Sequence, residues 1–128
     1  MKTSRRAKAA VSAMAATAAV AMFSAAPALA AFGAVAYDQG TGKYGASFNQ
    51  PKQSQAFEDA LKQCGSAGCR VYPVEPQGCG ALALSDKDKA WGGADRPSLS
   101  SARQDAVAHC QGHTTGGTCT VRVSGCNN

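Results

Sequence analysis

Apolar and polar positions follow the same order twice along residues 31–128. Each half begins with a short apolar run, at residues 32–37 and 79–84. A polar turn follows, and then a second run of aromatic and small residues at 43–48 and 89–94. Short runs of this kind, bounded by glycine and charged turns, are typical of β-strands. We therefore predict two strands at the start of each half.

A stretch with helical periodicity follows each pair of predicted strands. Apolar residues recur three and four positions apart in residues 56–64 and again in 102–110, which predicts helices with one apolar face. Residues 101–104, Ser-Ala-Arg-Gln, fit a capping box at the start of the second helix. Gly65 and Gly112 are expected to end the two helices.

The third strand of each half is predicted after the helix, at residues 69–74 and 119–123. The sequence Gly-Ala-x-Ala at 33–36 recurs 47 residues later, which indicates an internal duplication. This part of the chain is thus predicted to be one α+β domain of two strand-strand-helix-strand repeats, about 31–76 and 78–126. Because two repeats are too few for a solenoid, we expect the halves to pack with pseudo-twofold symmetry in a small disulfide-stapled domain.

Residues 1–30 have the pattern of a secretory signal peptide. Four basic residues precede an uncharged, alanine-rich stretch that ends in Ala-Leu-Ala, a small-x-small sequence that signal peptidase cleaves. Serine, threonine and proline interrupt this stretch, so it is a weak candidate for a membrane-spanning helix. We expect cleavage after Ala30, a secreted or periplasmic protein, and no stable membrane insertion afterwards. The Arg5-Arg6 pair leaves the twin-arginine route open, although Lys8 favours the general secretory route.

The net charge of +5 comes from the predicted signal rather than from the domain. The whole chain has 13 Lys and Arg against 8 Asp and Glu. Residues 1–30 hold four of the basic residues and no acidic one, which leaves the domain with a net charge of +1. Its basic residues are scattered or alternate with acidic ones, as at 86–89, whereas a nucleic-acid surface needs clustered Lys and Arg. Nucleic acid is therefore excluded as an expected partner.

All six cysteines lie in residues 31–128, and an even number in a small exported chain predicts disulfides. The six are Cys64, Cys69, Cys79, Cys110, Cys119 and Cys126. The repeat favours local pairs, Cys64 with Cys69 and Cys110 with Cys119. Cys79 is then left for Cys126. A symmetric alternative crosses the halves, with Cys64 bonded to Cys119 and Cys69 to Cys110, and the local set is preferred over it.

Several of these motifs together resemble one known family. They are the start Ala-Phe-Gly-Ala-Val-Ala-Tyr at 31–37, the Tyr-Gly at 44–45, and Gly-Cys-Gly-Ala-Leu-Ala at 78–83. Over Ala31 to Cys126 the chain is similar to the bacterial secreted domain of unknown function 4189 family. The resemblance implies export and a small disulfide-bonded domain, and it brings no catalytic residues to transfer. The proline-containing link at 73–78 departs from the pattern and bears on where the third strand of the first half ends.

Asp105, His109 and His113 are the candidate polar site, because they are spaced by four and would share a helix face. Such a face suggests a zinc site or an acid–base pair. Gly112 is expected to end the helix before His113, which would break that geometry, so we favour an ordinary helix surface and expect no metal or cofactor. An enzyme would be favoured if a cleft gathered these residues with Glu58 or Asp59.

Tyr44 and Trp91 occupy equivalent positions in the two halves, and such a pair can meet near the pseudo-twofold axis. They are either the largest residues of a small core or an exposed surface for a partner. The favoured function is an exported, non-enzymatic interaction or inhibitor-like module whose partner is an unknown protein or envelope component. The alternative is a small secreted hydrolase or metal-dependent enzyme that uses Asp105 and His109.

Overall fold

The structure, a computed structural model, describes residues 31–128. The predicted signal peptide at 1–30 lies outside the described residues. The first half contains β1 (Phe32–Tyr37), β2 (Tyr44–Gln50), α1 (Gln53–Cys64) and β3 (Arg70–Val74). The second half contains β4 (Cys79–Ser85), β5 (Trp91–Arg96), α2 (Leu99–His113) and β6 (Cys119–Cys126). Each half thus has the predicted order of two strands, a helix and a strand.

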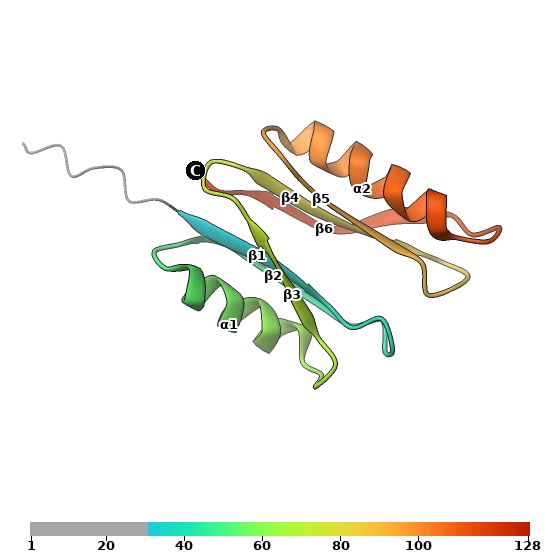
Figure 1. Ribbon diagram of the computed structural model, residues 1–128, viewed down its shortest axis with the longest axis horizontal. Coiled ribbons are helices and arrows are strands. Elements are labelled where there is room, and N and C mark those ends of the chain that lie inside the picture. The colour runs from blue at the N-terminus through green and yellow to red at the C-terminus, as the bar shows by residue number, and fades with distance from the viewer. Residues whose placement is uncertain (1–30) are drawn as a thin grey trace, which may run out of the picture.

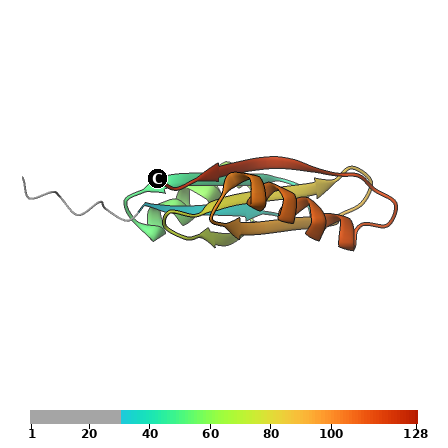
Figure 2. The same cartoon turned by 90° about the horizontal axis from the view of Figure 1, so that it is seen from above.

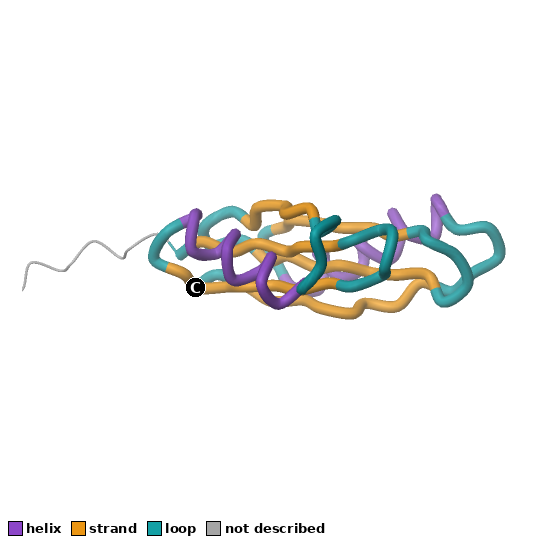
Figure 3. Tube along the Cα trace, turned by 90° about the horizontal axis from the view of Figure 1, so that it is seen from below, coloured by secondary structure: helices purple, strands orange, loops and turns teal. Residues whose placement is uncertain are grey.

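Each half forms its own three-stranded antiparallel sheet, and the two sheets stack face to face. The strand orders are β2-β1-β3 and β5-β4-β6. One helix covers the outer face of each sheet, so the layers run α1, first sheet, second sheet, α2 (Figure 1). The strands of both sheets follow the long axis of the molecule (Figure 3). This arrangement of two repeats confirms the predicted α+β fold.

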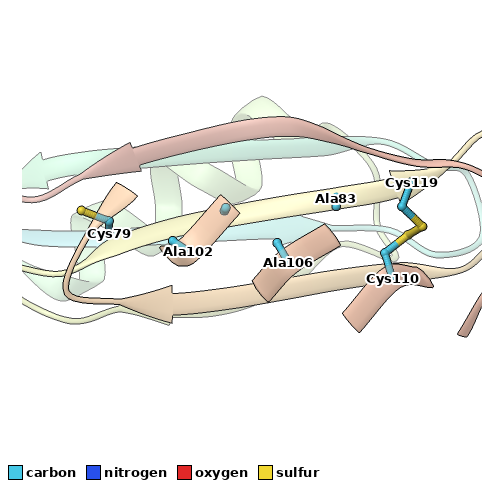
Figure 4. Packing of buried hydrophobic residues seen from close by; sticks show 7 residues of the cluster. Cys79, Ala83, Ala102, Ala106, Cys110 and Cys119 are labelled. Atoms are coloured by element: carbon cyan, nitrogen blue, oxygen red, sulfur yellow. A yellow bond between two sulfur atoms is a disulfide. The ribbon is translucent and has the colours of Figure 1, made fainter. Parts of the chain in front are cut away.

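The central strands β1 and β4 are buried on both faces, and their side chains differ from one face to the other. In β1, Ala34 and Ala36 pack against α1, whereas Val35 and Tyr37 point into the space between the sheets. In β4, Ala81 and Ala83 contact α2 in the same way, beside Ala102 and Ala106 of the helix (Figure 4). Small residues under the helices and large ones between the sheets therefore explain the Gly-Ala-x-Ala repeat.

Glycines in β2 and β5 let the helices approach the sheets closely. A Cβ atom at Gly45 would lie 2.5 Å from both the Ala60 carbonyl oxygen and the Cys64 nitrogen. Gly92 has the same relation to the backbone of α2. Only glycine leaves room for the helix backbone at this distance. This explains the glycine in both the Tyr44-Gly45 and the Trp91-Gly92 pair.

Three disulfides cross-link the domain. Cys64–Cys69 and Cys110–Cys119 each join the end of a helix to the start of the following strand region. Cys79–Cys126 joins the start of β4 to the end of β6. This is the local set that the repeat predicts, and the described residues contain no free cysteine.

Two predictions about α2 are wrong. The N-cap is Ser98, whose side chain accepts a hydrogen bond from the Ser101 nitrogen at 3.1 Å, so the capping box at 101–104 does not form. The helix also continues through Gly112 to His113. The physical reason lies next to the glycine, because Gln111 accepts a hydrogen bond from the Cys119 nitrogen at 2.7 Å and holds the last turn against β6. Gly65, by contrast, does end α1, with a φ of 74°.

Asn127 fastens the end of the second half to the first half. Its side chain is 3% exposed and donates to the carbonyl oxygens of Val74 at 3.1 Å and Glu75 at 3.0 Å. Its Oδ1 accepts from the Asn49 nitrogen at 3.0 Å. A Cβ atom at Gly33 would lie 2.7 Å from this Oδ1, so the start of β1 also lies directly against Asn127.

Candidate binding cleft

The sandwich has two long sides, which are built from equivalent strands. On one side β2 lies beside β6, and on the other β3 lies beside β5. Figure 2 shows β6 and β5 along opposite sides of the molecule. Pseudo-twofold symmetry exchanges β2 with β5 and β6 with β3, so the two sides would be alike if the halves were identical.

The β2–β6 side is closed. The ring of Phe48 on β2 lies against β6, and a Cβ atom at Gly125 would be 2.6 Å from two of its ring carbons. Val123 of β6 packs in the same cluster, and Asn127 crosses the end of this side. Side chains from both halves therefore fill the space between the sheets here.

The β3–β5 side is open and contains a cleft of about 300 Å³ between the sheets. Its walls are mainly apolar. The residues that line it include Val35, Tyr72, Val74, Leu82, Trp91 and Asp95. A cleft with apolar walls and few polar groups is the usual form of a ligand site.

Replacements in both strands distinguish this side from the closed one. On β3, Tyr72 and Val74 stand where β6 has Val123 and Gly125, and two more replacements lie on β5. Ala46 lies opposite Val35 in the first sheet, and Gly93 takes its place opposite Leu82 in the second. Two residues further along the same faces, Phe48 of β2 corresponds to Asp95 of β5. The second half thus lacks the methyl group and the ring that fill the first side, and a carboxylate takes the place of the ring.

Aromatic rings form one end of the cleft. The centroid of the Trp91 ring lies 5.5 Å from that of Tyr37 and 5.2 Å from that of Tyr72. Tyr37 is buried, and this burial raises the pKa of its hydroxyl, with the neighbouring Asp38 adding to the shift. Tyr72 is 37% exposed, whereas Tyr37 is 5% exposed.

Asp95 is the acidic group of the cleft. Its Oδ2 accepts a hydrogen bond from the Glu75 nitrogen at 3.1 Å. The next residue, Arg96, points to the other face of β5 and donates from Nε to Asp105 at 2.6 Å. Within residues 31–128 this is the one ion pair that forms, so the Asp95 carboxylate faces the cleft without a basic partner.

The structure does not gather the predicted polar residues into one site. Asp105 is engaged by Arg96, whereas His109 and His113 are exposed beside a separate hollow that Asp88 and Lys89 also line. No three His, Cys, Asp or Glu side chains among residues 31–128 lie close enough together to hold a metal ion. Glu58 and Asp59 are on α1, in the opposite outer layer of the molecule (Figure 1).

Asp88, in that hollow, lies in the loop between β4 and β5 and is hydrogen-bonded to the loop between α2 and β6. Its carboxylate accepts from the backbone nitrogens of Thr115 at 2.8 Å and Ala90 at 3.1 Å, and from the Thr114 hydroxyl at 2.9 Å. The Thr115 hydrogen bond is the largest cause that lowers the pKa of Asp88, to about 2. Asp88 is therefore charged at neutral pH and serves to connect two loops.

Tyr44 and Trp91 do not meet, contrary to the pairing that their equivalence allows. Trp91 packs on Tyr37 and Tyr72 at the cleft, whereas Tyr44 is 38% exposed at the start of β2. The reason is geometrical, because β2 and β5 are edge strands on opposite sides of the sandwich. Equivalent residues on them are kept apart by the symmetry that makes them equivalent.

Tyr72 and Asp95 are the cleft residues that the sequence analysis missed. The repeat contains a signal for Asp95, where Gly93 replaces Ala46 and Asp95 replaces Phe48, but only the stacking of β3 beside β5 shows that these positions face a cleft, and Tyr72 has no such signal. A position where the two copies of a repeat differ in size or polarity is thus a candidate for a residue that does not serve packing in one of them.

Comparison with known proteins agrees with this architecture. Residues 32–126 match the family described as Domain of unknown function (DUF4189). The chain belongs to this family. Protein Mb1300c of Mycobacterium bovis and Protein Rv1269c of Mycobacterium tuberculosis are each 37% identical to this DUF4189 chain over 81 residues. The match covers 63% of this chain and 62% of the length of each relative.

A solved structure shares the DUF4189 fold described above. The NMR structure of Rv1813c from Mycobacterium tuberculosis is 27% identical, with a TM-score of 0.58 over 79% of this chain and 78% of that chain. Within residues 31–128, no helix is both long and apolar enough to cross a membrane. The three disulfides fit a protein that works outside the cytoplasm.

Proposed function

We propose that this DUF4189 domain is an exported, non-enzymatic binding module, and that a partner protein of the envelope or surroundings inserts a side chain into the cleft between β3 and β5. The observation that carries the proposal is the difference between the two sides of the sandwich. Ala46 and Phe48 fill the space between the sheets on the β2–β6 side. On the β3–β5 side the same space stays open.

The walls of the cleft suit the role of an anchor pocket. Protein interfaces draw most of their affinity from a few side chains that enter well-packed, water-excluding pockets, and aromatic residues are enriched there. Trp91 and Tyr72 provide two large faces at the mouth, and the sheets behind them are cross-linked and covered by helices. A rigid pocket of this kind loses little conformational freedom when a partner binds.

Photo-cross-linking tests the proposal. A photoreactive amino acid at position 72 is compared with the same amino acid at position 44, because Tyr72 and Tyr44 are almost equally exposed, 37% and 38%. Both variants of the oxidised chain 31–128 are irradiated with envelope extract and with culture filtrate.

We expect a discrete adduct from position 72 that is absent from position 44. The adduct should also disappear when Gly93→Ala and Asp95→Phe give β5 the side chains that close the other side. An equal pattern from both positions, or an adduct at 72 that survives filling of the cleft, would refute the proposed site.

Export is proposed on the residues of 1–30, with cleavage after Ala30. The intact mass of the protein secreted by a bacterial host should correspond to a chain that begins at Ala31. A secreted or periplasmic protein that retains residues 1–30 would contradict this step, and so would a protein that stays in the cytoplasm.

A further inference from the structure

Resting on the proposed function, we propose that the side chain which enters the cleft is an arginine of an extended partner segment. Its alkyl stem would lie between the apolar walls, and its guanidinium would pair with Asp95. This proposal identifies the partner as a basic peptide. The open cleft by itself would show only that some side chain can enter.

The combination of walls and carboxylate excludes other occupants. A purely apolar side chain would cover Asp95 without pairing it, and an unpaired buried carboxylate is costly. An acidic group would be repelled by Asp95 and by Glu75, which lies next to it through the hydrogen bond from its nitrogen. A cation on an apolar stem satisfies both parts of the cleft.

The length of the cleft fits arginine. Trp91, Gly93 and Asp95 follow one another on the same face of β5, and same-face neighbours along a strand are about 7 Å apart. The Trp91 ring reaches over Gly93, because its Cζ3 would lie 3.5 Å from a Cβ atom placed there. A stem that passes the edge of this ring therefore ends near Asp95.

Arginine is preferred to lysine because of the geometry of its head group. The planar guanidinium can donate two hydrogen bonds to one carboxylate, whereas the ammonium of lysine is a point charge. The Trp91 ring contacts only the stem, so the preference rests on this fit to Asp95. Asp95 retains lone pairs for this purpose, because among residues 31–128 its only hydrogen-bonded donor is the Glu75 nitrogen.

Among the residues that the structure describes, 31–128, no basic side chain already occupies this position. Arg96 points to the α2 side of β5 and pairs with Asp105. Arg70 lies beyond the Tyr72 and Trp91 rings, in a separate hollow with Asp38. The cleft therefore has a negative charge at the end away from the Trp91 and Tyr72 rings, complementary to a basic partner.

Peptides of defined sequence test the assignment. The probes are blocked pentapeptides, Gly-Ser-X-Ser-Gly, in which X is arginine, lysine, citrulline or leucine. Citrulline has the shape of arginine without its charge. Binding to the oxidised chain 31–128 is followed by Trp91 fluorescence and by the NMR amide shifts of Gly93 and Asp95, since Trp91 is the single tryptophan of the chain.

We expect the arginine peptide to shift these signals with saturation, and to bind at least about tenfold more tightly than the citrulline and leucine peptides. Lysine should bind several-fold more weakly than arginine. Asp95→Asn should weaken the arginine peptide about tenfold, while its side-chain oxygen can still accept from Glu75 and keep the loop in place. Glu58→Gln on α1 is the matched control and should leave binding unchanged.

Equal binding of the citrulline or lysine peptide would overturn the assignment, and so would an Asp95→Asn variant that binds as the wild type does. If every peptide fails while the adduct from position 72 still forms, the arginine assignment is wrong and the binding module stands. If the adduct fails as well, the module itself is refuted.

Discussion

The two long sides of the sandwich are built from equivalent strands, but one side is closed by side chains and the other contains a cleft. Where β2 meets β6, Phe48 lies against Gly125 and Asn127 ties the ends together. Where β5 meets β3, Gly93 and Asp95 leave a cleft with aromatic rings at its mouth. Packing between the halves of a duplicated fold thus needs only one of the two long sides. The other side is then available for binding.

The largest expected effect concerns the disulfide at the end of the closed side. Cys79 and Cys126 are 47 residues apart, whereas Cys64 and Cys69 are 5 apart. Since a cross-link restricts the unfolded chain more when its loop is longer, removing the first pair should cost about 4 kcal/mol and the second about 2 kcal/mol. Chemical denaturation of the two double-alanine variants measures the difference. Equal losses would mean that the length of the closed loop does not set the contribution of these cross-links.

The next effect concerns Asn127. Asn127→Ala would leave the buried Val74 carbonyl oxygen without its partner, and would remove two part-buried hydrogen bonds, with the Asn49 nitrogen and the Glu75 carbonyl oxygen. We expect a loss of about 2–3 kcal/mol in the free energy of unfolding. Asn128→Ala, at an exposed neighbour, should change it by less than about 0.5 kcal/mol. Similar values for the two variants would show that the closed side does not depend on this side chain.

Filling the open side should have a smaller effect and the opposite sign. With Gly93→Ala and Asp95→Phe, β5 carries the side chains that β2 has at Ala46 and Phe48. A methyl group at 93 meets only ordinary contacts, with its nearest atom at 3.5 Å. Val74 stands where Gly125 makes room for the Phe48 ring, and Asp95→Phe removes the hydrogen bond from the Glu75 nitrogen. We therefore expect a gain of less than about 1 kcal/mol, with weaker quenching of Trp91 fluorescence by iodide. A loss of stability would indicate that the two sides are not interchangeable.

The smallest effect appears only in acid, at the hairpin end of the second half. The pKa of Asp88 in the folded protein is about 2, below the ordinary aspartate value, so the charged form stabilises the fold. This contribution is complete above about pH 4 and is lost as the pH falls from 4 towards 2. The stability difference between wild type and Asp88→Ala should therefore shrink over that range, as thermal unfolding at several pH values will show. A constant difference would contradict the role of the Asp88 charge.

Much of the fold follows from the sequence because the duplication doubles each weak signal. A single strand-forming run, helix face or cysteine is ambiguous by itself. It becomes clear when the same feature recurs 46 to 50 positions later. The end of α2 was missed because the local signal of Gly112 is overridden by a tertiary hydrogen bond, from the Cys119 nitrogen to Gln111. Gly65 has the same local signal in α1 and does end its helix.

The cleft was beyond the sequence analysis for a different reason. Finding it requires knowing that the two sheets stack with β3 beside β5, and no repeat pattern states which edges become neighbours. Tyr44 and Trp91 were paired because they are equivalent, yet equivalence under a twofold axis places edge residues on opposite sides. Asp105 looked like the partner of His109 on one helix face, but Arg96 of the adjacent strand lies closer to its charge.

The contact of Asn127 with Gly33 has a further consequence for the path of the chain. It places the first strand and the last residues of the described fold side by side. A short peptide could therefore close residues 31–128 into a ring, and the ring could be cut anew in the exposed turn at Gln39 and Gly40. Such a permuted chain would keep both sheets and all three cross-links, and would have its two new ends at the opposite pole of the molecule.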